Sequence, residues 1–423
     1  MRKTFSFLPE PGFVDKALSF ADQYLHAVYL NPNDYRYPHK AFLHVLAFGT
    51  YKELQAQPEN NFDALKKFLD QNRDWTFGYF SYDLKNEIEL LQSNHEDLIG
   101  FAPISFFVPE HLIFFEKEKI IIQSYDDPEK IYQAINRQNI DLSPISAITG
   151  LQQKISREAY IEKINLIRKH IKEGDLYEIN FCMEYFGRGV KLSPLAVYQK
   201  LNKISPMPFS SYVKIREHYL IGASPERFLK KEKQKIISQP IKGTAKRELN
   251  PEKDELVKTA LENNPKERAE NVMIVDLVRN DLSRSAVAGS VQAEELCKVY
   301  TFPKVHQMIS TIVAELPVSV HPIDMIRDAF PMGSMTGAPK VRAMELIEQY
   351  EESKRGLFSG AVGYFSPEMD FDFNVVIRSL LYNQAACTLS FQVGSAITYS
   401  SSAEMEYEEC AVKTAAIREV LNG

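Results

Sequence analysis

The feature that most constrains the fold of this chain is a series of short runs in which apolar and polar residues alternate. In LYEINFCMEYF, the odd positions from Tyr177 to Tyr185 are apolar or aromatic, and the positions between them, from Glu178 to Glu184, are mostly polar. Because side chains alternate between the two faces of a strand, this run predicts a strand with one polar face. Further strands are predicted at HYLIGASP, QKIISQPI, GAVGYFS, FDFNVVIRSLLY and CTLSFQVGSAITY.

Helical patterns separate some of these strands, whereas other strands follow one another directly. The clearest helix has Ser156 as its predicted N-cap, Tyr160, Ile164 and Ile167 on one face, and Gly174 at its end. Adjacent strands mixed with helices favour an α+β fold with mainly antiparallel sheet.

The length of 423 residues allows one large domain or two closely packed halves. A polar stretch, NRQNIDLSPISAITGLQQK, separates an N-terminal part from the rest of the chain. We therefore predict an N-terminal region over residues 1–145 and a second region, which carries the motifs described below, over residues 150–420.

Composition and charge argue against several classes of protein. The net charge is −6 and the basic residues are spread along the chain, so no nucleic-acid patch or membrane-surface helix is expected. The most apolar segment, LIGFAPISFFVPEHLIFF, contains prolines and charges, and the N-terminus lacks the apolar run of a secretion signal. We expect a cytoplasmic protein with no membrane contact. Widely spaced cysteines are expected to be reduced thiols, at Cys182, Cys297, Cys387 and Cys410.

Two pairs of acids lie in segments with a helical pattern. Glu267 and Glu270 are three residues apart, and so are Glu406 and Glu409, so each pair shares one helix face. If the two helices converge, the four carboxylates repel one another unless a hard cation such as Mg²⁺ lies among them. The alternative is two solvated helix faces, because Glu is common on the surfaces of helices.

Arg378 lies in the predicted strand FDFNVVIRSLLY. Strand alternation places it on one face with Asn374, Val376 and Leu380, which predicts a guanidinium that needs an anionic partner from the protein or a ligand. The alternative is a surface position on an edge strand.

A glycine-containing loop, FPMGSMTGAPKVRAMELI, precedes another predicted helix. Gly333 and Gly337 bracket Ser334 and Thr336, and Pro339 stands where the helix would begin. Backbone N–H groups at such a loop can bind an anion, although most glycine-rich turns only reverse the chain. No GK[ST] follows, so a nucleotide P-loop is not expected.

Lys242, in QPIKGT, and Glu226, in SPERF, complete the candidate residues. Burial lowers the pKa of a lysine, which can then act as a base or nucleophile, and raises the pKa of a glutamic acid, which can then donate a proton. The alternative for each residue is a surface charge beside a turn.

Taken together, these segments resemble the chorismate-utilising enzymes. The resemblance rests on GDLYEINF, SPERF, QPIKGT, KERAENVMIVDLVRNDL, GSMTGAPKVRAMELI, GAVGYFS and EYEE, in this order over residues 155–415. It implies an α+β sandwich of two mainly antiparallel sheets flanked by helices, with chorismate and Mg²⁺ bound between the sheets.

The resemblance also implies roles for the candidate residues. Glu270 and Glu409 would bind Mg²⁺, and Glu267 and Glu406 would support it through water. Glu226 would be the general acid that protonates the departing C4 hydroxyl. The residues implied at the substrate are Arg378 and Gly394 at the enolpyruvyl carboxylate, the loop residues Gly333, Ser334, Thr336 and Gly337, and Glu178 and Thr244.

Lys242 is the residue that best distinguishes members of the family. Members that make anthranilate or isochorismate typically have alanine here, whereas one kind of aminodeoxychorismate synthase has lysine. There the lysine adds to C2 of the ring as the C4 hydroxyl leaves, and ammonia then enters at C4 and expels the lysine. Three positions depart from the family pattern: Glu178, where amine-using members usually have glutamine, Gln307, where many have histidine, and Ser395, where glycine is common.

The leading hypothesis is therefore synthesis of aminodeoxychorismate from chorismate and ammonia. Anthranilate synthase component I is the first alternative, isochorismate synthase the second, and a non-catalytic chorismate-binding protein the third. No glutaminase nucleophile segment is found, so a separate glutamine amidotransferase subunit is expected to supply ammonia. No lyase segment is found either, so another enzyme is expected to release 4-aminobenzoate for folate synthesis.

Overall fold

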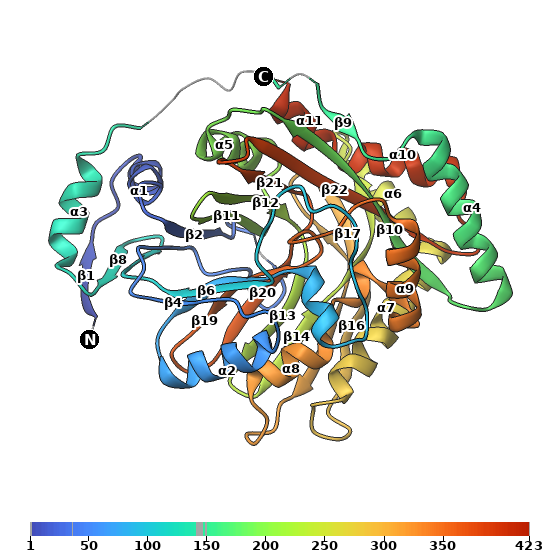
Figure 1. Ribbon diagram of the computed structural model, residues 1–423, viewed down its shortest axis with the longest axis horizontal. Coiled ribbons are helices and arrows are strands. Elements are labelled where there is room, and N and C mark those ends of the chain that lie inside the picture. The colour runs from blue at the N-terminus through green and yellow to red at the C-terminus, as the bar shows by residue number, and fades with distance from the viewer. Residues whose placement is uncertain (1, 36, 141–146, 149, 423) are drawn as a thin grey trace.

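Two large β-sheets form the body of the protein (Figure 1). The computed structural model describes residues 2–35, 37–140, 147, 148 and 150–422. The first sheet contains, from edge to edge, β1 (Lys3–Phe7), β8 (Ile120–Ser124), β7 (His111–Phe115), β3 (Val45–Phe48), β2 (His26–Asn31), β11 (Phe209–Ile215), β12 (His218–Ser224), β21 (Ser379–Asn383), β22 (Thr388–Ile397), β10 (Glu178–Arg188) and β18 (Gly337–Ala338), with β9 (Gln152–Gln153) also on β10.

The second sheet also carries several of the predicted strands. Its order is β15 (Ile241–Lys246), β17 (Val305–Glu315), β14 (Lys235–Gln239), β13 (Arg227–Glu232), β20 (Phe371–Val375), β19 (Ala361–Phe365), β5 (Thr76–Phe80), β6 (Ile104–Val108) and β4 (Lys52–Leu54), with β16 (Gln292–Thr301) also on β17. Every strand pair described is antiparallel, which confirms the predicted α+β class with mainly antiparallel sheet.

Helices cover the outer faces of both sheets (Figure 1). They are α1 (Phe13–Ala21), α2 (Asn61–Gln71), α3 (Pro128–Asn136), α4 (Arg157–Glu173), α5 (Pro194–Ile204), α6 (Pro251–Glu262), α7 (Pro265–Ser283), α8 (Pro322–Ala329), α9 (Lys340–Tyr350), α10 (Ala403–Lys413) and α11 (Ala415–Leu421), with 3₁₀ turns η1 (Tyr82–Glu87) and η2 (Gly333–Met335). None of the helices described is long and apolar enough to cross a membrane.

The caps of α4 are those predicted from the sequence. The Ser156 side chain accepts a hydrogen bond from the amide of Ala159, and Gly174 ends the helix in the left-handed conformation, with φ of 89°. The C-terminal segment with Glu406 and Glu409, which has a helical pattern in the sequence, forms two helices, α10 and α11, that meet at Thr414. Ser402 is the N-cap of α10, without a capping hydrogen bond from its side chain.

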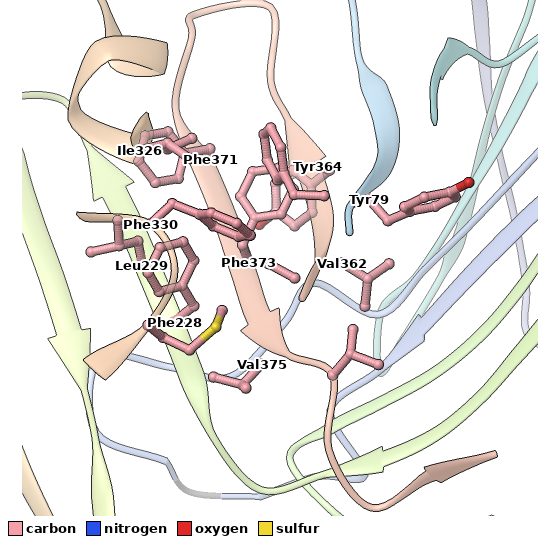
Figure 2. Packing of buried hydrophobic residues seen from close by; sticks show 14 of the residues in the cluster. Tyr79, Phe228, Leu229, Ile326, Phe330, Val362, Tyr364, Phe371, Phe373 and Val375 are labelled. Atoms are coloured by element: carbon pink, nitrogen blue, oxygen red, sulfur yellow. The ribbon is translucent and has the colours of Figure 1, made fainter. Parts of the chain in front are cut away.

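Two hydrophobic clusters hold the layers together. One packs the outer face of the first sheet against helices that include α1, α4, α5 and α11. The other contains residues of both sheets and of α2, α7 and α8. Figure 2 shows part of the second cluster, where Phe371, Phe373 and Val375 of β20 lie with Phe330 and Ile326 at the end of α8.

The chain passes between the sheets at two neighbouring crossings. Pro225 and Glu226 connect β12 of the first sheet to β13 of the second, and residues 376–378 connect β20 back to β21. The crossings are bonded together, because the Val375 amide donates to the Glu226 carbonyl and the Ala223 amide donates to the Arg378 carbonyl, both at about 3 Å. This pairing places Glu226 and Arg378 where the sheets meet.

The prediction of one continuous strand over FDFNVVIRSLLY is therefore wrong. Alternation continues through the sequence, but Arg378 has φ of 51° and belongs to neither strand. The backbone turns there to change sheets, which a pattern of side chains does not reveal.

The predicted boundary between residues 145 and 150 lies largely outside the described residues. The N-terminal region contributes strands to both sheets: β2 pairs with β11, and β5 pairs with β19. The division into regions 1–145 and 150–420 stays a prediction.

Candidate active site

Lys242 and Glu178 meet where the edges of the two sheets approach each other. Lys242 lies on β15, Glu178 begins β10, and the lysine Nζ donates to the glutamate Oε1 at 2.5 Å. The side chains are 10% and 1% exposed. The polar face predicted for β10 is thus buried and turned toward the second sheet, while Ile179 and Phe181 pack in the cluster under the outer helices.

The charge state of Lys242 differs from the prediction. Burial lowers the pKa of Lys242, but the Glu178 carboxylate outweighs burial and holds this pKa above the ordinary lysine value. The predicted fall in pKa is wrong, because a buried cation with an anion in contact keeps its proton.

Glu226 is a buried carboxyl with one hydroxyl partner. Ser334 Oγ, from η2, donates to Glu226 Oε1 at 2.5 Å. Burial raises the pKa of Glu226 to about 7, although the Ser334 hydrogen bond and the charges of Lys242 and Lys413 oppose the rise. A carboxyl with this pKa holds its proton near neutrality and can donate it, as the sequence predicts.

The four predicted acids come together from α7 and α10. Glu270 and Glu406 are buried, and their Oε1 atoms each lie 3.7 Å from Nζ of Lys266, which therefore connects the two helices. Burial raises the pKa of Glu270 to about 7 and also raises the pKa of Glu267. The alternative of two separate solvated helix faces is wrong for Glu270 and Glu406.

Lys413 links the last acid to the neighbouring strand. Its Nζ lies 2.6 Å from Glu409 Oε1 and donates to the Gly394 carbonyl at 2.9 Å. Burial raises the pKa of Glu409, but Lys413 outweighs it, so this pKa stays below the ordinary value. Burial lowers the pKa of Arg378, and the Glu409 charge opposes this, so the guanidinium lies within electrostatic reach of Glu409.

The glycine loop packs too closely for larger residues. A Cβ on Gly337, where φ is 152°, would lie 2.1 Å from the Glu178 carbonyl oxygen, and one on Gly333 would lie 2.7 Å from Leu277. Thr336 is buried and its hydroxyl donates to the Met332 carbonyl at 3.2 Å, so this hydroxyl serves the loop itself.

Comparison with known proteins identifies the family of the chain. Residues 26–419 match the family described as chorismate binding enzyme. The chain belongs to this family. An aminodeoxychorismate synthase component 1 from Klebsiella aerogenes is 36% identical over 335 residues, 78% of this chain and 74% of that protein. An anthranilate synthase component 1 from Thermus thermophilus is 31% identical over 355 residues, 80% and 76% of the two chains.

A solved structure supports the fold of this chorismate-binding enzyme. Anthranilate synthase component I from Streptococcus pneumoniae superposes with a TM-score of 0.77 at 25% identity, covering 91% of this chain and 95% of that chain. The predicted two-sheet sandwich flanked by helices is confirmed.

The four acids carry the type of side chain that binds a hard divalent cation. Carboxylate oxygens are the ligands that Mg²⁺ prefers, and Oε1 of the buried Glu270 has no hydrogen-bond partner. Within the part of the chain that the structure describes, no three acids stand close enough together to ligate one ion as they are, and the ammonium of Lys266 lies between two of them. The ligand roles of the four glutamates stay predictions.

Two residues of the site were not identified from the sequence. Lys266 precedes Glu267 and Lys413 follows Glu409 by one helical turn, so each could have been identified as a cation next to a predicted acid.

Of the other residues named in the sequence analysis, Thr244 lies exposed on β15 opposite Gln307, which is buried.

Proposed function

We propose that this chorismate-binding enzyme converts chorismate and ammonia to 4-amino-4-deoxychorismate, the activity named for its aminodeoxychorismate synthase component 1 relatives. The observation that carries the proposal is the enclosed amine of Lys242, in contact with Glu178 and within electrostatic reach of Glu226 and Glu270. An amine in this place can act as a nucleophile, which alanine cannot.

In the first step Lys242 adds to C2 of the chorismate ring. The two ring double bonds shift, the bond from C4 to its hydroxyl breaks, and the Glu226 proton leaves with the hydroxyl as water. Glu226 suits this step because its pKa of about 7 leaves a substantial fraction of the carboxyl protonated in neutral solution, and Ser334 fixes the carboxyl.

In the second step ammonia adds to C4. The double bonds shift back, the bond between C2 and Lys242 Nζ breaks, and the lysine recovers its electron pair. The ionised Glu226 takes a proton from the new ammonium group, which restores the general acid. The covalent intermediate replaces one difficult substitution with two easier ones.

Charged groups around the lysine would hold the substrate. Arg378, at the crossing of the sheets, would pair with the enolpyruvyl carboxylate, and the η2 loop would shape the site around it. Glu270 and Glu409, supported by Glu267 and Glu406, would hold Mg²⁺. When bound, the cation would neutralise the ring carboxylate of chorismate.

A separate glutamine amidotransferase subunit would supply the ammonia. The word component in the names of the relatives supports a partner of this kind. The test is glutamine-dependent turnover with and without such a subunit, with ammonium chloride as the positive control. Turnover that occurs with ammonium chloride, but not with glutamine and any amidotransferase subunit, would contradict this part of the proposal.

The identity of the product tests the proposed function. Purified protein is incubated with chorismate, Mg²⁺ and ammonium, with and without aminodeoxychorismate lyase, and the products are separated and identified by mass. We expect 4-aminobenzoate only when the lyase is present. Anthranilate and pyruvate formed without the lyase would instead establish the second candidate, anthranilate synthase, which the 31% identical relative and the Streptococcus structure favour.

A further inference from the structure

Glu178 and Lys242 form an ion pair that joins the two sheets at the site. Glu178 is 1% exposed on its side chain, and its backbone pairs with Ala338 of β18. One carboxylate oxygen, Oε1, accepts the hydrogen bond from the Lys242 ammonium, whereas the other, Oε2, is buried with no hydrogen-bond partner among the described residues. Leaving a buried anion half satisfied is costly, so this arrangement is a poor choice for stability alone.

The proposed reaction requires Lys242 to lose a proton. An ammonium group has no free electron pair, so Nζ cannot form a bond to C2 until one of its protons has left. Burial also separates the amine from bulk water. A proton acceptor must therefore stand within hydrogen-bond distance of Nζ.

The neighbouring acids differ in their suitability. The groups that act on Lys242 are Glu178, Glu270 and Glu226. Glu226 must keep its own proton for the leaving hydroxyl, and Glu270 lies beside Lys266. Among the described residues, the Lys242 ammonium has its hydrogen bond with Glu178 alone, at 2.5 Å.

We propose that Glu178 is the proton acceptor that activates Lys242. As chorismate fills the site, an N–H bond of Lys242 breaks and an O–H bond forms on Glu178, which leaves a neutral amine and a neutral carboxyl. The amine then adds to C2. When ammonia expels the lysine, the amine takes the same proton back, so the pair returns to its starting state. This inference rests on the proposed function and assigns Glu178 a role in it.

The decisive variant is Glu178→Gln. Glutamine has nearly the shape of glutamate and can still accept the hydrogen bond from Nζ, but it cannot take the proton. The whole protein is mixed with chorismate and Mg²⁺ without ammonia, quenched at intervals, and analysed by intact mass for an adduct of chorismate less one water on Lys242. We expect adduct formation to slow about 100-fold or more, the scale of general base catalysis.

The pH dependence separates proton transfer from simple positioning. Adduct formation in every variant falls above about pH 7, as Glu226 loses the proton that the leaving hydroxyl needs. In Glu178→Gln, Lys242 must also release its proton to solvent, which becomes easier as pH rises. The rate of the variant divided by the native rate at the same pH is therefore expected to rise from pH 7 to pH 9, because in the native protein Glu178 takes the proton internally. Glu178→Asp, which keeps a carboxylate, is expected to recover part of the rate.

Glu184→Gln is the matched control. Glu184 is buried on the same face of β10, but its carboxylate accepts from Ser390 and not from Lys242. Its variant is expected to form the adduct at the native rate, and chorismate binding is measured for every variant by protein fluorescence. The inference is overturned if Glu178→Gln forms the adduct as fast as the native protein does. It is also overturned if Glu178→Asp and Glu178→Gln both bind chorismate and form the adduct at the same rate. Either result leaves the proposed function intact. No adduct in the native protein without ammonia, together with direct formation of anthranilate once ammonium is added, overturns both.

Discussion

Ser334 donates a hydrogen bond of 2.5 Å to Glu226, a residue 108 positions earlier in the chain. The serine comes from η2 and the glutamate from the crossing between the sheets. The bond stabilises the ionised carboxylate, so it moderates the rise in pKa that burial causes at Glu226. Two distant segments thus set the acidity of the group that we assign to protonating the leaving hydroxyl.

Removing this hydroxyl should shift the pH dependence of catalysis. Ser334→Ala takes away a partner of the charged form, so the pKa of Glu226 rises above about 7. The general acid must be protonated, so kcat/KM falls as the pH rises through the pKa of Glu226. In the variant this fall, the alkaline limb of the pH profile, should move to higher pH. Loss of the fixed orientation should also lower kcat, by about 10-fold.

A serine close by provides the control for this experiment. Ser238 is also buried, but its hydroxyl donates to the Phe228 carbonyl at 2.9 Å rather than to Glu226. Ser238→Ala should leave the alkaline limb in place. A limb that shifts equally in both variants would show that the Ser334 hydrogen bond is not the cause.

Glu270 should make the folded protein less stable at neutral pH than a neutral residue in its place would. Folding raises the pKa of Glu270 from 4.5 to about 7, so the folded state holds this proton more tightly than the unfolded chain does. Glu270 therefore lowers the free energy of unfolding by its full amount above about pH 7, and by less and less as the pH falls toward 4.5. Glu270→Gln should therefore raise that free energy by up to about 3 kcal/mol at pH 8, with little gain at pH 5.

Urea unfolding at both pH values, with a chelator present, measures this difference. Glu255→Gln is the control, because Glu255 lies on α6 with its side chain 68% exposed. Mg²⁺ should raise the urea midpoint of the native protein and have little effect on Glu270→Gln. A gain in stability that is the same at pH 5 and pH 8 would contradict the assigned cause.

Local sequence patterns predicted much of the fold. Alternation identified β10, β12 and β14 because each is a regular strand between turns, and the Ser156 and Gly174 caps placed both ends of α4. These features depend on residues close together in the chain, where side-chain periodicity and backbone hydrogen bonding agree.

The positions of the charges could not be predicted in the same way. Lys242 and Glu178 are 64 residues apart, so neither the ion pair nor the raised lysine pKa follows from neighbours in sequence. Arg378 continues a strand pattern and yet turns between sheets, because the choice of sheet is made by pairing partners and not by the alternation itself. The resemblance to a family identified the candidate site residues, and the structure showed which of them are in contact.

The core around β20 should be sensitive to loss of volume. Phe373, labelled in Figure 2, is fully buried. The ring centroids of Phe80 and Phe365 lie 5.2 and 5.1 Å from that of Phe373. Phe373→Ala should lower the free energy of unfolding by about 3–5 kcal/mol. Leu90→Ala, at a residue 107% exposed, should change it by less than about 0.5 kcal/mol in the same urea experiment. Similar losses for the two variants would rule out this packing as the source.

Lys242→Ala should separate chorismate binding from amination. The variant lacks the amine that adds to C2, so formation of aminodeoxychorismate should fall by about 100-fold or more. Arg378 and the four acids proposed to hold Mg²⁺ are untouched, so chorismate should still bind. Because the variant has the alanine typical of anthranilate-forming enzymes, anthranilate is the by-product to look for in the mass-resolved product analysis.

The control for this variant is Lys246→Ala on the same strand, where the lysine is exposed. It should retain native turnover, since Lys246 lies at the end of β15 outside the site. Native rates of aminodeoxychorismate formation in Lys242→Ala would remove the covalent step from the mechanism. In that case ammonia would have to displace the C4 hydroxyl directly, and Glu226 would act without a nucleophilic partner.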